Sequence, residues 1–305
     1  MSGNGGRWLC AAAMAIAAAL TGTTGAQADS TPAPAAPEGK ALVVLGDSYS
    51  ANAWASQDGG CVHGTTSWPV QLSALMGVAG SDQVADQSCT GASLDTGNSY
   101  TLAIEARDAD KAGAFGPKTK LVTIQFGPND TWGGASQNLW NASQQCLFDL
   151  ADGCGPDAVA AGRMPDPQQV TGTQYATRIQ KIVTYIRYYA PNAHIVLVGY
   201  PELFPAEQNS VCMDFFGMVP FTQPRGRTVV EYFNRIDQAQ REAAAQLKLD
   251  YLDSRTLTAG HGACTAQPWI NGVYDPTTKI DGLPFHPAPA GDAVVAKALY
   301  ERYTR

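Results

Sequence analysis

Apolar residues fall into two alternating patterns along the chain. Short continuous runs of apolar and β-branched residues, typical of buried strands, occur at 41–45, 83–87, 119–126, 195–198 and 251–253. Segments with apolar residues every three or four positions, as on one face of a helix, occur at 67–76, 102–112, 173–189, 229–247 and 290–303. This alternation predicts one α/β domain with a parallel sheet of about five strands and helices on both faces.

Three long segments interrupt the alternation. Residues 132–172 contain several glycines and prolines, and we expect an irregular segment there. A long segment of that kind in a compact domain is usually a functional loop or lid. Two further loops carry Cys212 and Cys264, and the second of them also carries Trp269 and Tyr274.

The first 28 residues have the features of a secretory signal peptide. Arg7 precedes an alanine-rich apolar stretch, and Ala26-Gln27-Ala28 is a small-residue cleavage pattern. A membrane anchor is the alternative, but the apolar stretch is short for one. Residues 29–40 are rich in proline and alanine and are expected to be a flexible linker. This leaves residues 41–305 as the folded domain of an extracellular protein.

Charge and composition narrow the class of protein. The chain of 305 residues is 45% hydrophobic, which is enough for one sizeable core. Its net charge is −7, and no run of lysine and arginine is present. This pattern disfavours nucleic-acid binding.

Six cysteines follow the predicted signal peptide. An even number of cysteines in an exported chain predicts disulfides. We favour sequential pairing, Cys61–Cys89, Cys146–Cys154 and Cys212–Cys264, because each bond would then anchor one long loop. The absence of a C-x-x-C pair and of histidines at ligand spacing disfavours a metal site instead.

Polar residues follow three of the predicted strands directly. Ser48 comes after the first strand, Gly91 after the second and Asn129 after the third. In a doubly wound sheet of order 2-1-3-4-5 these strands are neighbours, and their carboxyl ends meet at the switch point where such folds bind ligands. We therefore expect Ser48 to be a nucleophile. The backbone N–H groups of Ser48 and Gly91 and the Asn129 amide would form an oxyanion hole.

A serine nucleophile needs a base, and the sequence contains four histidines. His194 starts a strand, and we interpret it as structural. His63 and His261 lie in loops and stay open as alternatives. His286 directly precedes the last helix, the usual late position of the base in α/β hydrolytic enzymes, and is the preferred candidate.

Taken together, Gly46-Asp47-Ser48, Gly91, Gly127-Pro128-Asn129-Asp130 and His286 resemble the four sequence blocks of the SGNH (GDSL) hydrolase superfamily. With its cysteine-containing loops, the chain looks most like the secreted actinobacterial esterase, lipase and phospholipase A branch. The resemblance covers residues 41–305. It implies a flavodoxin-like three-layer α/β/α fold, the site roles given above, and ester hydrolysis without metal or cofactor.

The chain departs from the family pattern beside the histidine. The family commonly has Asp three residues before it, where this chain has Leu283. Two alternatives remain: Asp281 reaches back to His286, or a backbone carbonyl near Leu283 orients the imidazole. We favour the carbonyl.

These features predict a secreted serine esterase that hydrolyses carboxylic esters through an acyl-enzyme. Lipid esters are the preferred substrates, because the loops around the site are aromatic: they contain Trp54, Trp132, Trp140, Trp269 and Tyr274. A carbohydrate acetyl esterase is the alternative, and a non-catalytic binding module is a third. We expect a monomer that contacts lipid surfaces transiently and does not bind nucleic acid.

Overall fold

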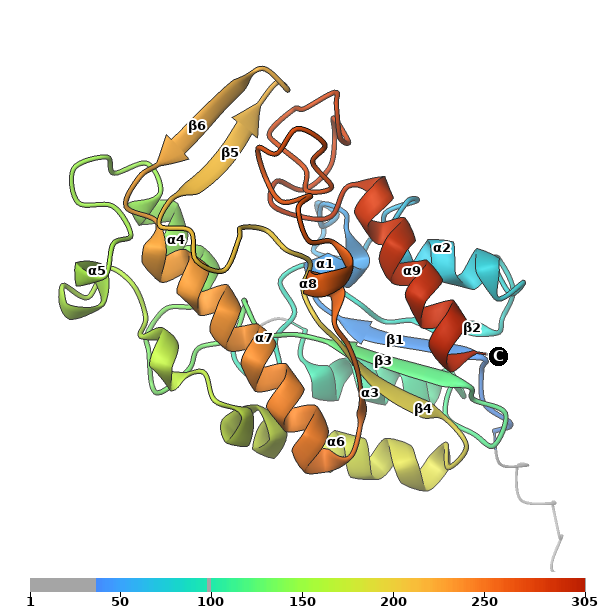
Figure 1. The fold of residues 1–305 in the computed structure, drawn as a ribbon. Helices are drawn as coiled ribbons and strands as arrows, with labels where there is room; N and C mark the ends of the chain where they lie inside the picture. The colour runs from blue at the N-terminus through green and yellow to red at the C-terminus, as the bar shows by residue number, and fades with distance from the viewer. Residues whose placement is uncertain (1–36, 98–99, 305) are drawn as a thin grey trace, which may run out of the picture. The chain divides into compact units, whose positions relative to one another are not determined.

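Five parallel strands form the central sheet of the computed structural model, which describes residues 37–97 and 100–304. The strands are β1 (Leu42–Gly46), β2 (Val84–Asp86), β3 (Leu121–Gln125), β4 (His194–Val198) and β7 (Asp250–Leu252). Their spatial order, β2-β1-β3-β4-β7, is the predicted order 2-1-3-4-5 (Figure 1). The predicted signal peptide and most of the linker lie outside the described residues.

Five helices of the described residues cover the two faces of the sheet. They are α2 (Trp68–Leu75), α3 (Leu102–Lys111), α6 (Gly172–Tyr189), α7 (Arg227–Leu247) and α9 (Pro289–Tyr303). Val43 and Leu45 of β1 point into a cluster with α3, α6 and α7, while Leu42 and Val44 point into a second cluster with α2 and α9. Successive side chains of a strand point to opposite faces, so a strand buried on both faces must be apolar throughout. This confirms the three-layer prediction.

Residues 132–172 are not the irregular segment that we expected. They contain α4 (Leu139–Cys146), α5 (Asp157–Ala160) and a 3₁₀ turn at Pro167–Gln169. Asn138 caps α4, and the buried residues Leu139, Ala142 and Cys146 lie on one face of that helix. The cue was present in the sequence: an Asn N-cap precedes apolar residues at helical spacing. The surrounding glycines and prolines obscured it.

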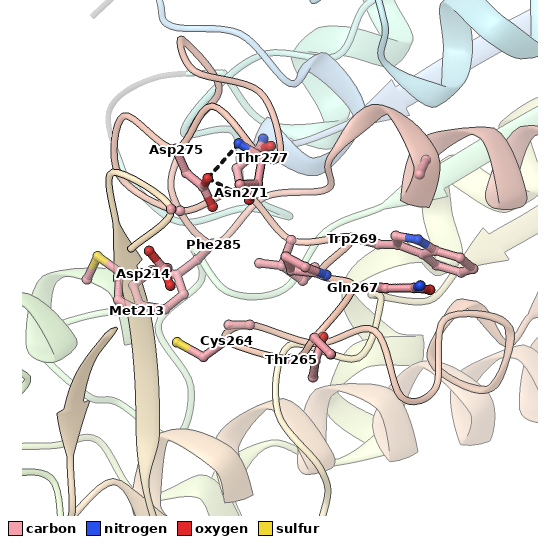
Figure 2. A pocket seen from close by; sticks show the side chains of 17 residues that line it. Met213, Asp214, Cys264, Thr265, Gln267, Trp269, Asn271, Asp275, Thr277 and Phe285 are labelled. Carbon is pink, nitrogen blue, oxygen red and sulfur yellow. Dashed lines mark hydrogen bonds between the residues drawn. The ribbon is translucent and has the colours of Figure 1, made fainter. Parts of the chain in front are cut away.

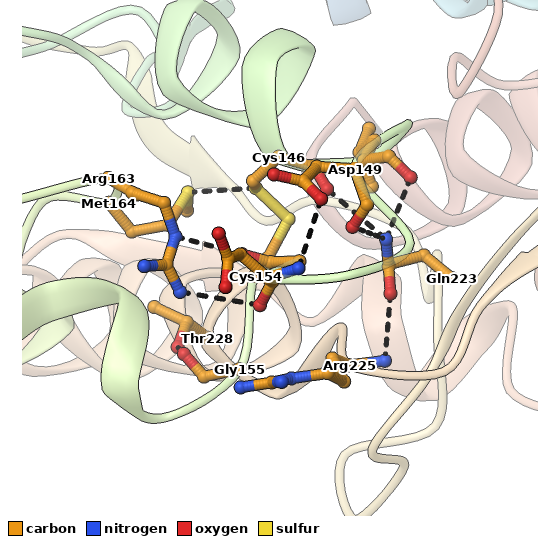
Figure 3. Close-up of a disulfide and its surroundings, with 12 residues drawn as sticks. Cys146, Asp149, Cys154, Gly155, Arg163, Met164, Gln223, Arg225 and Thr228 are labelled. Atoms are coloured by element: carbon orange, nitrogen blue, oxygen red, sulfur yellow. Dashed lines mark hydrogen bonds between the residues drawn. A yellow bond between two sulfur atoms is a disulfide. The ribbon is translucent and has the colours of Figure 1, made fainter. Parts of the chain in front are cut away.

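The segment is also anchored to the rest of the domain. Cys146 is bonded to Cys154, and the side chain of Gln223 donates to the carbonyl oxygens of Cys146, Leu147 and Asp149 (Figure 3). Gln223 is fully buried. These hydrogen bonds of the buried amide fix residues 146–149 to the strand that carries Gln223.

The loop expected around Cys212 is an antiparallel hairpin, β5 (Val211–Phe215) and β6 (Val219–Gln223). The Cys212–Cys264 disulfide ties this hairpin to the segment between α8 (Ser254–Leu257) and α9. The third bond is Cys61–Cys89. The structure therefore contains the sequential pairing that we favoured. No helix in the described ranges is both long and apolar enough to cross a membrane.

Candidate active site

Strand β1 delivers Ser48 to the carboxyl edge of the sheet. The strand ends at Gly46, Asp47 caps the short helix α1 (Ser48–Ala51), and Ser48 is the first residue of that helix. A Cβ atom on Gly46 would lie 2.4 Å from Ser50 Oγ, so the close approach of α1 to the strand requires glycine there.

Ser48 and His286 meet at this edge although they lie 238 residues apart. His286 Nε2 is 2.8 Å from Ser48 Oγ, a hydrogen-bonding distance. His286 Nδ1 is 2.9 Å from the backbone oxygen of Pro284. Because a carbonyl oxygen can only accept, Nδ1 carries the proton and Nε2 is free to accept the serine proton.

Asp281 does not orient His286. Its side chain is exposed, and its backbone oxygen accepts a hydrogen bond from Trp54 Nε1. The group in contact with Nδ1 is the carbonyl of Pro284, the residue after Leu283, so the carbonyl stays our preferred orienting group. The tight turn places this carbonyl against the ring, because the N–H of His286 donates back to Leu283 O.

The imidazole is buried beside two aromatic rings. Tyr49 stacks on it with ring centroids 4.4 Å apart, and the Trp140 centroid lies 6.0 Å from that of His286 and 6.4 Å from that of Tyr49. Burial lowers the pKa of His286 from 6.5 to about 4, against a smaller opposite effect of the Pro284 hydrogen bond. His286 is therefore a neutral proton acceptor at pH 7 in the free protein.

The three expected oxyanion donors come from the start of α1 and from the two loops beside it. The N–H of Cys89 donates to Gly46 O, which holds the loop of Gly91 against the end of β1, and Asn129 Nδ2 donates to Ala92 O. Within the described part of the chain, neither the Ser48 nor the Gly91 backbone N–H donates to another residue. Gly91 has a φ of 85°, a conformation that favours glycine.

Two buried carboxyl groups hold the backbone around Ser48. Asp47 accepts hydrogen bonds from the backbone N–H of Tyr49 and from the Tyr200 hydroxyl, and burial raises its pKa to about 7. Glu105 accepts from the backbone N–H of Gly46 at 2.7 Å, and burial raises its pKa well above the usual range. Glu105 was detectable, because it lies on the buried face of its helix with Leu102 and Ala109.

A buried ion pair connects the loops that carry Gly91 and Asn129. Asp130 is fully buried and accepts from the backbone N–H of Leu94, while Arg178 of α6 forms ion pairs with both Asp130 and Asp95. Asp130 thus holds the two loops together and does not contact Ser48.

The remaining histidines lie in other environments. His63 contacts Ser88 O and Asp86, His194 pairs with Asp250, and His261 stacks on Trp269. Of the predicted aromatic residues, Trp140 reaches His286, whereas Trp132 is buried against Tyr175 and Arg178. No group of three or more acidic, histidine or cysteine side chains placed to hold a metal occurs in the described residues.

A pocket of about 520 Å³ lies between the β5–β6 hairpin and the segment before α9 (Figure 2). Met213 and Asp214 line one side, and Asn271, Asp275 and Phe285 line the other. Neither Ser48 nor His286 is among its lining residues. We therefore do not assign this pocket to the ester that Ser48 would attack.

A serine in contact with a neutral histidine at the switch point of a parallel sheet is the arrangement of a serine hydrolase. Residues 44–294 match the GDSL-like Lipase/Acylhydrolase family, and the chain belongs to that family. It is a carboxylic ester hydrolase.

Similar proteins have been characterised in Streptomyces. Lipase 1 of Streptomyces coelicolor is 26% identical over 94% of this chain and 93% of its own length, and an esterase of Streptomyces scabiei is 27% identical over 97% and 94%. Two solved structures share the fold. An extracellular lipase of Streptomyces rimosus has a TM-score of 0.56 at 20% identity, covering 85% of this chain and 99% of that one. The phospholipase A1 of Streptomyces albidoflavus has a TM-score of 0.57 at 21% identity, covering 84% and 98%.

The low pKa of His286 predicts the pH profile of hydrolysis. We expect kcat/KM for a soluble ester to rise with pH through about 4, as His286 loses its proton, because only the neutral ring can accept the serine proton. An Asp47→Asn variant, which removes the carboxyl whose pKa is about 7, should keep this acid limb. An acid limb centred at pH 6.5 or higher in both proteins would contradict the account.

The contact with the Pro284 carbonyl predicts a small effect of Asp281. An Asp281→Asn variant should keep kcat/KM within about threefold of the native value, because its side chain does not contact the imidazole. Replacing a true triad acid costs about 10⁴-fold in kcat. A loss of that size in steady-state hydrolysis would restore Asp281 as the orienting acid.

Proposed function

We propose that Ser48 and His286 hydrolyse carboxylic esters through a covalent acyl-enzyme. The observation that carries this proposal is the 2.8 Å contact between Ser48 Oγ and the unprotonated Nε2 of His286. The pair lies at the carboxyl edge of a parallel sheet, where α/β folds place their chemistry.

In the first half of the reaction, His286 takes the proton of Ser48 as Oγ attacks the ester carbonyl carbon. The negative charge that develops on the carbonyl oxygen is stabilised by the N–H groups of Ser48 and Gly91 and by the Asn129 amide. The tetrahedral species then collapses, and the imidazolium gives its proton to the leaving alcohol.

In the second half, His286 removes a proton from water as the water attacks the acyl carbon. The bond from the acyl carbon to Ser48 Oγ then breaks, the imidazolium returns its proton to Oγ, and the acid leaves. Throughout, the Pro284 carbonyl holds the Nδ1 proton and so fixes the ring orientation. A neutral carbonyl takes the place that a carboxylate holds in Ser-His-Asp enzymes.

Esters of lipids are the proposed substrates. Trp140 and Phe285, which lie beside His286, pack with Leu147, Leu203, Val229 and Phe233 around a space of only about 10 Å³, too small to hold an acyl chain as it stands. The apolar character of these neighbours nevertheless favours an acyl chain over a sugar beside the reacting pair. The lipases among the relatives support the same substrate class.

The protein is proposed to act outside the cell as a monomer. The three disulfides persist only in an oxidising environment, and the relative from Streptomyces rimosus is extracellular. We propose residues 1–28 as the cleaved signal peptide, 29–40 as a linker and 41–305 as the hydrolase domain.

The apolar side chains beside His286 predict a preference for acyl chains over acetyl groups. In a series of p-nitrophenyl esters, kcat/KM should increase from acetate to medium-length chains, because each buried methylene contributes about 0.8 kcal/mol. Ser48→Ala protein should be inactive on every ester and serves as the blank. Activity confined to acetyl esters and acetylated xylan would favour the carbohydrate acetyl esterase, and undiminished hydrolysis by Ser48→Ala would reject the proposed mechanism.

A further inference from the structure

The turn of the β5–β6 hairpin exposes large apolar side chains. Phe216 is 53% exposed, Met218 79% and Val219 55%. Tyr274, from the segment before α9, is 67% exposed and stacks on Phe216 with ring centroids 6.3 Å apart and an interplanar angle of 12°. We call these four residues the apolar tip. Because side chains from two segments pack together in solvent, they form one surface and are not isolated exposed residues.

The backbone at the apolar tip is unfavourable for the residues that it carries. Phe216 and Gly217 have φ values of 60° and 68°, and the N–H of Met218 donates to Phe215 O. This is the geometry of a type I′ turn, which strongly prefers Asn-Gly. Tyr274 also has a positive φ, of 50°.

Bulky residues with positive φ are uncommon, and strain of this kind gathers at functional sites. Neither core packing nor turn formation calls for an aromatic residue at these two exposed positions. A binding role for the apolar tip would account for both Phe216 and Tyr274.

The apolar tip is joined directly to the segment that holds the histidine. The N–H of Phe216 donates to Val273 O, and the N–H of Asn271, two residues earlier, donates to His286 O. In Figure 1 the hairpin stands beside this segment, away from α6. Figure 2 shows Asp214 of β5 and Asp275 in the wall of the pocket at this junction. A partner surface that binds the apolar tip would therefore lie on the side of the molecule that carries the Ser48–His286 pair.

The charge of the protein indicates what kind of surface binds the apolar tip. Residues 215–223 contain no charged side chain, and the whole chain has a net charge of −7. An anionic membrane would repel the protein, whereas a surface without net charge would accept the aromatic and Met side chains without that cost.

We propose that the apolar tip inserts into the surface of aggregated, zwitterionic ester lipids and docks the enzyme on its substrate. This inference rests on the proposed function for its choice of lipid. Docking itself is separate from the chemistry, because no residue of the apolar tip contacts Ser48 or His286.

The decisive variant is Phe216→Asn, which suits the type I′ turn better than the native residue. Full-length protein is sedimented with phosphatidylcholine vesicles, and the bound fraction is measured. We expect the partition coefficient to fall about tenfold or more, because burial of a Phe side chain is lost. The thermal midpoint should not decrease, and hydrolysis of dissolved p-nitrophenyl acetate should be unchanged.

Tyr188→Asn is the matched control, because Tyr188 is 78% exposed on α6, distant from the hairpin in Figure 1. It should bind vesicles like the native protein. Equal binding by Phe216→Asn and native protein, or no binding by native protein, would overturn the proposal. So would a dimer that Phe216→Asn dissociates in sedimentation velocity, since the surface would then join two copies.

Ser48→Ala separates this proposal from the proposed function. An inactive Ser48→Ala protein that binds vesicles like the native one supports both. If Ser48→Ala keeps its hydrolytic activity, the catalytic proposal fails while the vesicle result stands on its own.

Discussion

The hydrogen bond between Ser48 and His286 is the interaction on which the rest of the site depends. It joins the first strand of the sheet to the turn before the last helix, so almost the whole chain must fold before it can form. Hydrogen bonds from neighbouring residues fix the backbone beside both Ser48 and His286. Glu105 and Asp47 fix the backbone around Ser48, and the Pro287 carbonyl, next to His286, accepts from the side chains of Asn52 and Asn271.

Burying three titratable side chains around the Ser48–His286 pair costs free energy of folding. Burial raises the pKa of Asp47 and of Glu105 and lowers that of His286. In all three cases burial disfavours the charged form of the side chain. For His286 the consequence is useful, since a neutral imidazole is the form that accepts a proton. A backbone carbonyl as its partner fits the same design, because a buried carboxylate on Nδ1 would favour the charged ring.

The sheet and its order followed from the sequence because strands buried on both faces must be apolar throughout, and that pattern is unambiguous. The proximity of Ser48 to the loops of Gly91 and Asn129 followed as well, since the topology brings the ends of β1, β2 and β3 together. The hairpin at 211–223 and helix α4 did not follow. The hairpin turn uses Phe216 where Asn is the usual signal, and α4 is a short helix held by the Cys146–Cys154 disulfide and Gln223. The support from Tyr200 and Glu105 depends on contacts between distant segments, which local patterns do not encode.

The central claim is that Ser48 is the nucleophile, and covalent labelling tests it most directly. Native protein is treated with a fluorophosphonate at pH 7, digested and mapped by mass spectrometry. The account predicts a single adduct on the peptide that contains Ser48, formed in step with the loss of esterase activity. An adduct on another residue, or full inactivation without modification of Ser48, would contradict it.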